Sequence, residues 1–356
     1  MQFRGEKLTV TVFGQSHAPA IGMVMAGVPA GFRVDREALQ TFLDRRAPGQ
    51  GAHTTARKEA DVPEFVSGLV ADTSCGAPIC AMIRNSDTHS RDYSQFLTVP
   101  RPSHADYPAR VKYGTSFDIR GGGQFSGRLT APLCVAGGMA LQWLKGQGVR
   151  IGAHIAAIGG VPDAAFDPVQ VNDQDFDLIA KNAFPVLDPK AGKAMLQAIV
   201  DARLAQDSVG GEVECAVLGL PVGVGGALFD GLESALSAAL FAIPAVKGVS
   251  FGDGFAAAAL RGSQHNDAYM LRDGRVQTAT NHAGGILGGM TTGMPLLMRA
   301  AFKPTPSIGQ PQRSVNLDTM EETELIITGR HDPCVVPRAV PVVEAMAALV
   351  LMDRLL

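Results

Sequence analysis

The C-terminal segment 338–356 constrains the fold more than any other part of this sequence. It has the pattern of a helix, and its first half is apolar nearly all round apart from Glu344. A helix with no polar face is buried between layers rather than packed on a surface. The longest apolar run, 345–352, is far too short to span a bilayer. We therefore expect a layered protein with this helix inside it.

The length and composition allow such a core. The chain has 356 residues, of which 46% are hydrophobic and 18% charged. A chain of this length forms one large domain or two intimate ones. We predict a single domain spanning 1–356, with the segment 160–190, rich in Asp and Pro, as an elaborated surface connection.

Periodicity predicts the remaining elements. Apolar residues at helical spacing predict helices over 35–46, 129–143, 189–206 and 229–243. Strand-like patterns cover 8–13, 79–84, 212–220 and 324–328. Within 212–220, Val213, Cys215 and Val217 alternate with polar or small residues, which predicts a strand with one buried face.

Similar Gly-rich turns at 27–31 and 219–223 each precede a predicted helix. Two related halves and chance resemblance in a Gly-rich chain both account for this similarity.

Charge and cysteine content narrow the classes of function. The formal net charge of -3 gives no reason to expect a nucleic-acid partner. The five cysteines form no C-x-x-C pair and are expected to be buried thiols in a reducing compartment. The segment 1–12 looks like a short strand with its lead-in rather than a leader peptide. We expect a soluble cytoplasmic protein without a membrane partner.

A cluster of charges precedes the final helix. Arg330, His331, Asp332 and Arg338 lie between the predicted strand 324–328 and that helix. Charges at the mouth of a buried helix are costly unless they are paired or meet a ligand. The cluster therefore predicts an anion site with one carboxylate among the cations.

Other short motifs carry groups of the same kind. His17 and Ser16 follow the strand 8–13, and His104 lies next to Asp106, which could orient it or hold it charged. Each of these histidines, taken alone, is more typical of a plain surface loop than of a functional site. The Gly-rich run 120–128 enters a helix that Ser126 could cap, an arrangement suited to an anion, or to a bend required by packing.

Arg45 and Arg46 end the helix 35–46, where they could pair with its dipole or present guanidinium to an anion. Lys303 adds a cation beside two hydroxyls on a stiff segment. Glycines near cations and hydroxyls fit a flat phosphorylated cofactor, although a rigid loop fits too. No pair of His or Cys residues has metal-ligand spacing, so no metal is predicted.

Taken together, these motifs closely resemble the chorismate synthase family, in that family's order and over nearly the whole chain. The matching motifs are F-G-Q-S-H at 13–17, R-R-A-P-G at 45–49, S-H-A-D-Y at 103–107, R-G-G-G at 120–123, N-H-A-G-G-I-L-G-G at 281–289, K-P-T-P-S at 303–307 and G-R-H-D-P-C-V at 329–335. The last motif, with R-A-V-P after it, is highly specific.

The resemblance implies a lyase that converts 5-enolpyruvylshikimate 3-phosphate to chorismate and phosphate by 1,4-elimination in the shikimate pathway. The family requires reduced FMN, and NADPH is a candidate reductant. The implied fold is α+β, with helices sandwiched between two mainly antiparallel sheets, and the implied assembly is a homotetramer. A flavin-dependent oxidoreductase on the same scaffold is the alternative, and a non-catalytic flavin-binding protein would not need both histidines and the aspartate.

The resemblance also implies roles for single residues. The implied catalytic residues are His17 (protonating the leaving phosphate), His104 (protonating or stabilising the reduced flavin) and Asp332 with Ser16 (helping to pass the ring proton away through the flavin N5). The implied substrate-binding residues are Arg45, Arg46, Arg128 and Arg338. The implied FMN-binding residues are Arg46, Gln124, Phe125, Ser126, Ala245, Gly288, Lys303, Pro304, Thr305, Pro306, Ser307 and Arg330.

The sequence departs from the family pattern at a few of these positions. Many members have R-S-S where this chain has Gln124, Phe125 and Ser126, which puts an arginine contact to FMN in doubt. Ala52 stands where many members have Arg, and Pro244 where many have Asn. These differences weaken individual contacts more than the resemblance itself.

Overall fold

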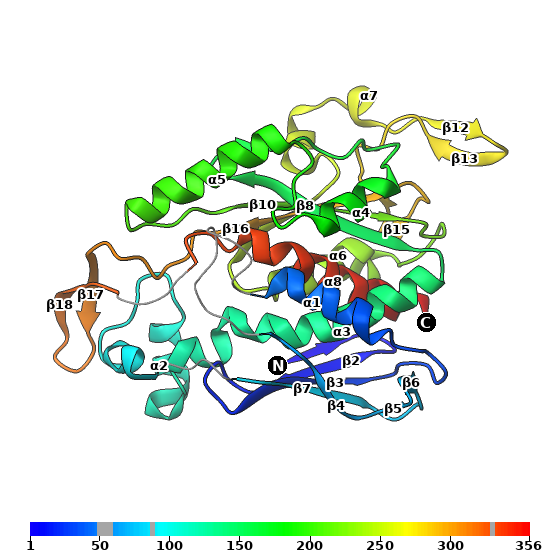
Figure 1. Ribbon diagram of the computed structural model, residues 1–356. Coiled ribbons are helices and arrows are strands. Elements are labelled where there is room, and N and C mark those ends of the chain that lie inside the picture. The colour runs from blue at the N-terminus through cyan, green and yellow to red at the C-terminus, as the bar shows by residue number, and fades with distance from the viewer. Residues whose placement is uncertain (48–59, 86–89, 328–331) are drawn as a thin grey trace.

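A computed structural model describes residues 1–47, 60–85, 90–327 and 332–356 of the chain (Figure 1). Two antiparallel five-stranded sheets form its frame. The first has the order β1 (Gln2–Arg4), β2 (Thr9–Phe13), β3 (Ala20–Ala26), β7 (Ile79–Arg84), β4 (Glu64–Ser67). The second has the order β11 (Val246–Phe251), β16 (Leu296–Phe302), β10 (Gly211–Leu218), β8 (Arg150–Ile158), β9 (Val161–Pro162).

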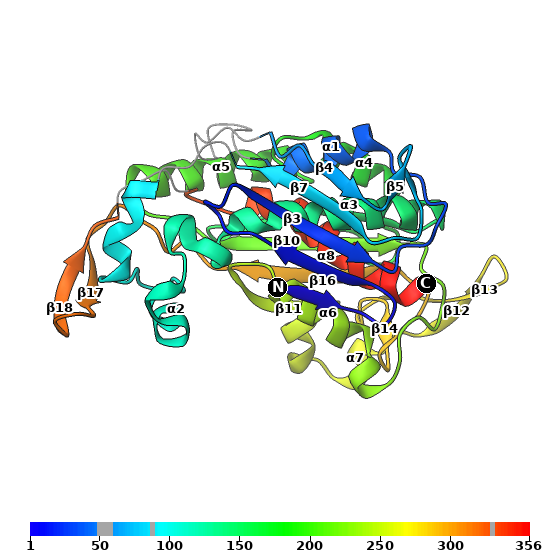
Figure 2. The same ribbon diagram turned by 90° about the horizontal axis from the view of Figure 1, so that it is seen from below.

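A layer of helices lies between these sheets in Figure 1, and Figure 2 shows the first sheet spread across the front of that layer. The helices of the layer are α1 (Arg36–Arg46), α3 (Thr130–Gly146), α6 (Leu232–Phe241) and α8 (Val336–Leu355). Two further helices, α4 (Asp173–Lys181) and α5 (Pro189–Leu204), lie on the other side of the second sheet. The prediction of an α+β protein with antiparallel sheets is confirmed.

Outside this frame lie smaller elements. Four two-stranded hairpins are β5–β6 (Leu69–Val70, Thr73–Ser74), β12–β13 (Tyr269–Arg272, Arg275–Thr278), β14–β15 (Ile286–Leu287, Met290–Thr291) and β17–β18 (Gln312–Asn316, Glu321–Leu325). Two helices, α2 (Asp106–Tyr113) and the short α7 (Gly262–His265), complete the set used below.

The final helix is buried as its composition requires. Nearly every side chain of α8 from Val336 to Asp353 is withdrawn from solvent. Gly137 lets α3 approach it closely, because a Cβ there would lie 2.3 Å from the Cβ of Ala345. The lone acid, Glu344, accepts two hydrogen bonds from the guanidinium of Arg45, at 2.6 and 2.9 Å, and one from the backbone of Ala153. A buried charge is thus fully paired.

The first helix also forms as predicted. Asp35 caps α1 by accepting a hydrogen bond from the backbone N–H of Ala38 at 2.9 Å. Leu39 and Leu43 are buried on its inner face, and Arg46 ends it. The segment 229–243 is helical only over α6, since residues 228–230 form a 3-10 turn. The strand predicted at 324–328 lies earlier, at β18, where it pairs with β17.

One prediction about the second sheet is wrong. Residues 213–217 of β10 are all buried, so this strand has two covered faces rather than one. Helix α8 packs on β10 from one side. From the other side, Phe166 and Phe176 of the segment 160–190 pack against Ala216. That segment was predicted as a connection, and the helix α4 within it was not predicted.

The cysteines are only partly as expected. Cys134, Cys215 and Cys334 are buried, but Cys75 is exposed and Cys80 half-buried. Cys75 directly follows the β5–β6 hairpin. Among the described residues, no helix combines the length and apolar character needed to cross a membrane.

Candidate active site

The loop between β2 and β3 presents Ser16 and His17. Gly14 begins this loop with φ +93°, and a Cβ there would lie 2.6 Å from the carbonyl oxygen of Ala20. His17 is 8% exposed, and its ring meets the edge of Tyr93 with ring centroids 5.3 Å apart. The histidine is therefore held in a tight loop against an aromatic wall.

A glycine turn lies against two histidines. Gly121 and Gly122 have φ +61° and +82°. A Cβ on Gly121 would lie 2.7 Å from Nε2 of His17, and a Cβ on Gly122 would lie 3.4 Å from Nε2 of His104. The backbone at Gly121 is too close to His17 to admit a side chain, and at Gly122 it is in van der Waals contact distance of His104. The sequence motifs 13–17, 103–107 and 120–123 are thus brought together.

His104 is oriented by its neighbours. Its Nδ1 lies 2.7 Å from Oδ1 of Asp106, so this nitrogen carries the hydrogen and Nε2 is the acceptor in the neutral ring. Arg101 donates to both oxygens of Asp106, at 2.7 and 2.8 Å. Burial opposes ionisation of Asp106, but the bonds from Arg101 and His104 outweigh it and hold the pKa of this carboxyl well below its ordinary value. The predicted orientation of His104 by Asp106 is confirmed.

The segment 303–307 joins this region. Arg101 donates from Nη1 to Oγ of Ser307 at 3.4 Å, and Nζ of Lys303 donates to the carbonyl oxygen of Ser103. The backbone N–H of Lys303 donates to the carbonyl oxygen of Ala245 at 2.9 Å. Burial, with a smaller contribution from Lys247, lowers the pKa of the Lys303 ammonium.

One buried polar atom in this segment lacks a partner among the described residues. The hydroxyl oxygen Oγ1 of Thr305 is shielded from solvent without a hydrogen bond. Buried polar atoms are normally bonded, so each exception needs an explanation. A ligand that accepts a hydrogen bond would satisfy this one.

Gly288 does not join Ala245 in the described chain. It lies in the turn of the β14–β15 hairpin, next to the start of α6, where Leu232 donates to the carbonyl oxygen of Gly289 at 2.9 Å. Ala245 lies just beyond the other end of α6. At about 1.5 Å per residue, a helix of 10 residues separates them by roughly 15 Å.

A buried carboxylate unites two of the predicted substrate-binding arginines. One oxygen of Asp61 accepts a hydrogen bond from Arg46 and the other accepts one from Arg128. Arg46, 2% exposed, also donates to Oγ1 of Thr130 at 3.0 Å. Arg128 donates from Nε to Oδ1 of Asn85 at 3.1 Å.

The other two predicted arginines have different surroundings. Arg338 pairs with Asp332 at 2.5 Å and donates from Nε to the carbonyl oxygen of Arg46 at 3.0 Å, so it adjoins the Asp61 cluster. Arg45 is engaged by Glu344 in the helical layer. Arg330 and His331 lie outside the described residues, as does Ala52.

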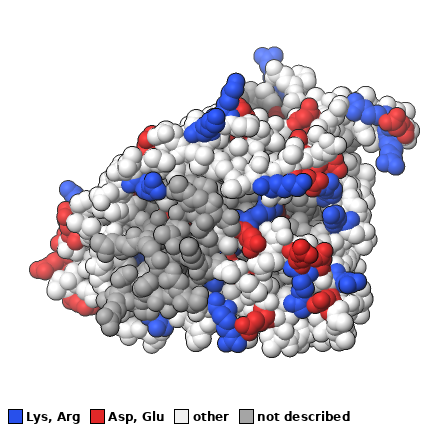
Figure 3. Space-filling model, viewed as in Figure 1, with Lys and Arg blue, Asp and Glu red and all other residues white. Residues whose placement is uncertain are grey.

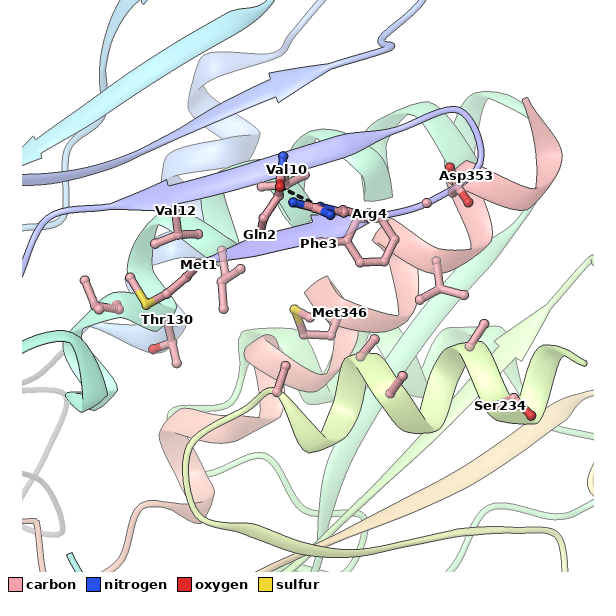
Figure 4. Close-up of a pocket in the computed structure, with 18 of the residues that line it drawn as sticks. Met1, Gln2, Phe3, Arg4, Val10, Val12, Thr130, Ser234, Met346 and Asp353 are labelled. Carbon is pink, nitrogen blue, oxygen red and sulfur yellow. Dashed lines mark hydrogen bonds between the residues drawn. The ribbon is translucent and has the colours of Figure 1, made fainter. Parts of the chain in front are cut away.

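A cavity of about 770 Å³ adjoins the glycine turn (Figure 4). It lies between the first two strands and α6, and Gln124, Ser126 and Pro244 belong to its lining. Most of the lining is apolar, as at Val12 and Met346. Neither His17 nor His104 lines it. Phe125 stacks obliquely on Tyr113 instead, with ring centroids 6.5 Å apart.

Ser126 connects the cavity to the histidine loop. As predicted, it caps a helical turn, since its Oγ accepts a hydrogen bond from the backbone of Arg128 at 3.3 Å. It also donates to Oγ of Ser16 at 3.2 Å. The serine that this chain keeps from the R-S-S pattern thus contacts the serine next to His17.

Sequence reasoning missed Asp61, Asn85 and Tyr93 as parts of this region. No spacing rule singles out a lone acid or amide, and their partners are distant in the sequence. Arg101 was visible only as a neighbour of His104. On the face in Figure 3, basic and acidic side chains are interspersed, whereas the charge of the site is buried.

Two imidazoles, a carboxylate paired with arginine, and buried guanidinium groups are the kinds of group that an enzyme acting on an anionic small molecule uses. The chorismate synthase family model matches residues 8–356. The chain belongs to the chorismate synthase family.

Curated relatives agree over nearly the full length. The chain is 46% identical to chorismate synthase of Lancefieldella parvula, covering 99% of this chain and 95% of that protein. It is equally identical to the enzyme of Thermococcus kodakarensis, covering 99% and 97%. A chorismate synthase crystal structure superimposes with a TM-score of 0.76 over 99% of this chain and 92% of that one, at 24% identity, which shows the shared fold.

Proposed function

We propose that this chain converts 5-enolpyruvylshikimate 3-phosphate to chorismate and inorganic phosphate by 1,4-elimination. Membership of the family over 8–356 carries this proposal. The glycine turn against His17 and His104 supports it, because it draws three family motifs to one place. The substrate has two carboxylates and a phosphate, and the buried arginines fit such an anion.

Within this proposal, His17 holds the proton that the departing phosphate takes up. Its tight loop and its wall at Tyr93 fix the ring, which suits a general acid. Asp332, paired with Arg338 at 2.5 Å, accepts the ring proton, with Ser16 in support. Arg128 and Arg338 bind the substrate anions. Arg45 is the weakest member of the predicted set, because Glu344 already binds its guanidinium.

Reduced FMN fits the residues around 303–307. Lys303 and Ser307 supply charge and a hydroxyl, and Thr305 has a buried hydroxyl that a phosphate oxygen would satisfy. Ala245 contacts the same segment through Lys303. When bound, the reduced flavin supplies electron density as the phosphate leaves. His104, fixed by Asp106, presents Nε2 as an acceptor when neutral and as a donor when charged.

The other predicted contacts to FMN remain proposals. Gln124 and Ser126 line the cavity beside the glycine turn. Pro304 and Pro306 stiffen the segment that holds Thr305. The position of Gly288, at the far end of α6 from Ala245, does not support a contact between Gly288 and an FMN bound by the same chain.

We further propose that the enzyme is one domain built as a β-α-β sandwich, with an internal repeat, and assembled as a homotetramer in the cytoplasm. The helical layer between two five-stranded sheets supports the sandwich. The five cysteines, all described, form no disulfide, which fits a reducing compartment. Light scattering on the purified protein tests the tetramer.

Phosphate release tests the reaction. Protein, substrate and dithionite-reduced FMN are mixed without oxygen, and phosphate and chorismate are measured together with the flavin absorbance. We expect turnover with no flavin consumed. No phosphate release under fully reduced conditions would contradict the proposal, and stoichiometric loss of reduced flavin would favour an oxidoreductase. Replacing dithionite with NADPH shows whether the protein reduces its own FMN.

A further inference from the structure

Asp61 occupies an unusual place for an acid. Its side chain is 0% exposed and lies between the guanidinium groups of Arg46 and Arg128, whose side chains are 2% and 3% exposed. Its backbone has φ +48°, a conformation that side chains seldom adopt. A strained backbone conformation of this kind persists only where the surrounding structure holds it in place.

The hydrogen bonds of Asp61 extend to both sides of the site. Through Arg128 they reach Asn85, whose Nδ2 donates to the carbonyl oxygen of Ala18 at 2.8 Å, in the loop that carries His17. Through Arg46 they reach Arg338, which donates to the backbone carbonyl of Arg46 and pairs with Asp332. One carboxylate thus lies in the middle of a chain of contacts between the proposed acid and the proposed base.

Charge explains why a carboxylate is needed there. Two buried guanidinium groups in close proximity repel each other, and neither can lose its proton. Asp61 lies between the two positive charges and offsets their repulsion by bonding to both. Burial alone would raise the pKa of Asp61, but Arg46 and Arg128 outweigh burial and lower it, so the charge is present at neutral pH.

We propose that Asp61 is a positioning residue that holds Arg128 and Arg46 in the geometry that binds the anionic groups of the substrate. This inference rests on the proposed function. The alternative is that Asp61 is a placeholder that the substrate must displace. The full burial of Asp61 favours a fixed scaffold. To be displaced, its carboxylate would have to break its bonds to both guanidinium groups and move out into solvent.

The two roles predict opposite changes in KM. A scaffold that is lost raises KM, whereas a placeholder that is lost lowers it. For Asp61→Asn, which keeps the volume but removes the charge, we expect KM for the substrate to rise at least about tenfold, the usual scale for removing one partner of a buried pair, with a smaller change in kcat. An unchanged or lowered KM would overturn the inference.

Added formate shows whether a change in KM comes from losing the carboxylate charge at position 61 or from losing the packing of that side chain. In Asp61→Ala, formate can occupy the vacated space, so it should lower KM of the variant and leave the wild-type KM unchanged or raised by competition. A raised KM on which formate has no effect would show that the carboxylate charge is not what matters. Where the alanine variant fails to fold, Asp61→Glu takes its place and should retain a lower KM than Asp61→Asn.

A matched control lies three positions away. Glu64 and Arg84 form the same kind of carboxylate–guanidinium pair, at 3.1 Å, but both side chains are more than half exposed. Glu64→Gln should leave KM unchanged, because exposed pairs contribute little. The wild-type assay separates the two levels of inference: absent phosphate release rejects the proposed function, while normal release with an unchanged KM in Asp61→Asn rejects the role of Asp61 alone.

Discussion

Two buried charged clusters, one where α1 ends and α3 begins and one in the second sheet, differ in the groups that they bind. At the site, the carboxylate of Asp61 binds two side chains, those of Arg46 and Arg128. In the second sheet, His154 lies between Asp163 and Glu214, with its ring nitrogens 3.0 and 2.9 Å from their oxygens.

The second cluster is complete in itself. Glu214 also accepts hydrogen bonds from Arg299 at 2.9 and 3.0 Å, so two acids face two bases once His154 is charged. Backbone N–H groups of the segment 160–190 bind the same acids, including those of Phe166 and Leu187. A cluster that binds backbone N–H groups fastens a segment to a sheet, whereas a cluster that joins arginine side chains beside two histidines can hold those side chains for a ligand.

The largest expected effect falls on turnover. His17→Ala and Asp332→Ala should each reduce kcat by about 10²–10⁴-fold, the usual contribution of a general acid or base, without changing the affinity for FMN. Phosphate release and flavin titration measure the two quantities separately. Either variant working at the wild-type rate would remove that residue from the mechanism.

The second expected effect falls on stability. His154→Ala leaves Asp163 and Glu214 buried with one partner fewer, which should lower the free energy of unfolding by about 3–5 kcal/mol. Denaturant unfolding measures this loss. The kcat of the folded variant should stay at the wild-type value. A large loss of kcat would contradict the purely structural role of the His154 cluster.

The pH dependence of that loss follows from the pKa shifts. Burial alone would lower the pKa of His154, but Asp163 and Glu214 outweigh burial and raise it. The stabilisation by His154 is therefore fully present below its unfolded pKa of about 6.5 and is lost as the pH rises through the folded pKa. The pKa values of Asp163 and Glu214 are lowered, so their stabilisation is lost as the pH falls through the folded values.

The difference in unfolding free energy between wild type and His154→Ala should therefore be largest in mildly acidic solution, above the ordinary carboxyl pKa of about 4 and below about 6.5. It should shrink in alkali, as the imidazole loses its proton, and in acid, as the carboxylates gain theirs. A difference that does not vary with pH would show that His154 stabilises the sheet through packing alone, for example against Phe166.

The smallest expected effect concerns the FMN segment. Thr305→Val removes a buried hydroxyl without a partner, so the free protein should gain up to about 1 kcal/mol of stability. Its affinity for FMN should fall several-fold, because the flavin phosphate loses one donor. Thermal melting measures the expected gain in stability, and flavin titration measures the expected loss of FMN affinity. Lower stability with unchanged affinity would contradict the proposed contact.

Several features followed from the sequence because they are local. The cap at Asp35 and the burial of the final helix depend on residues close to one another in the chain. His104 and Asp106 are two positions apart, so their contact was also within reach. The family motifs gave the order of the site residues.

Other features depend on which distant segments pack together. Whether β10 has one covered face or two depends on where the segment 160–190 lies, which the period of the strand does not encode. The pairing of Arg45 with Glu344 joins positions 299 residues apart.

The sequence by itself determined a buried C-terminal helix, an α+β protein and the chorismate synthase family, because these rest on local periodicity and motifs. Only the tertiary structure decided which arginine meets which acid. It assigned Asp61 to two arginines and Glu344 to Arg45, because charges pair with their nearest partners in space, and those are distant along the chain.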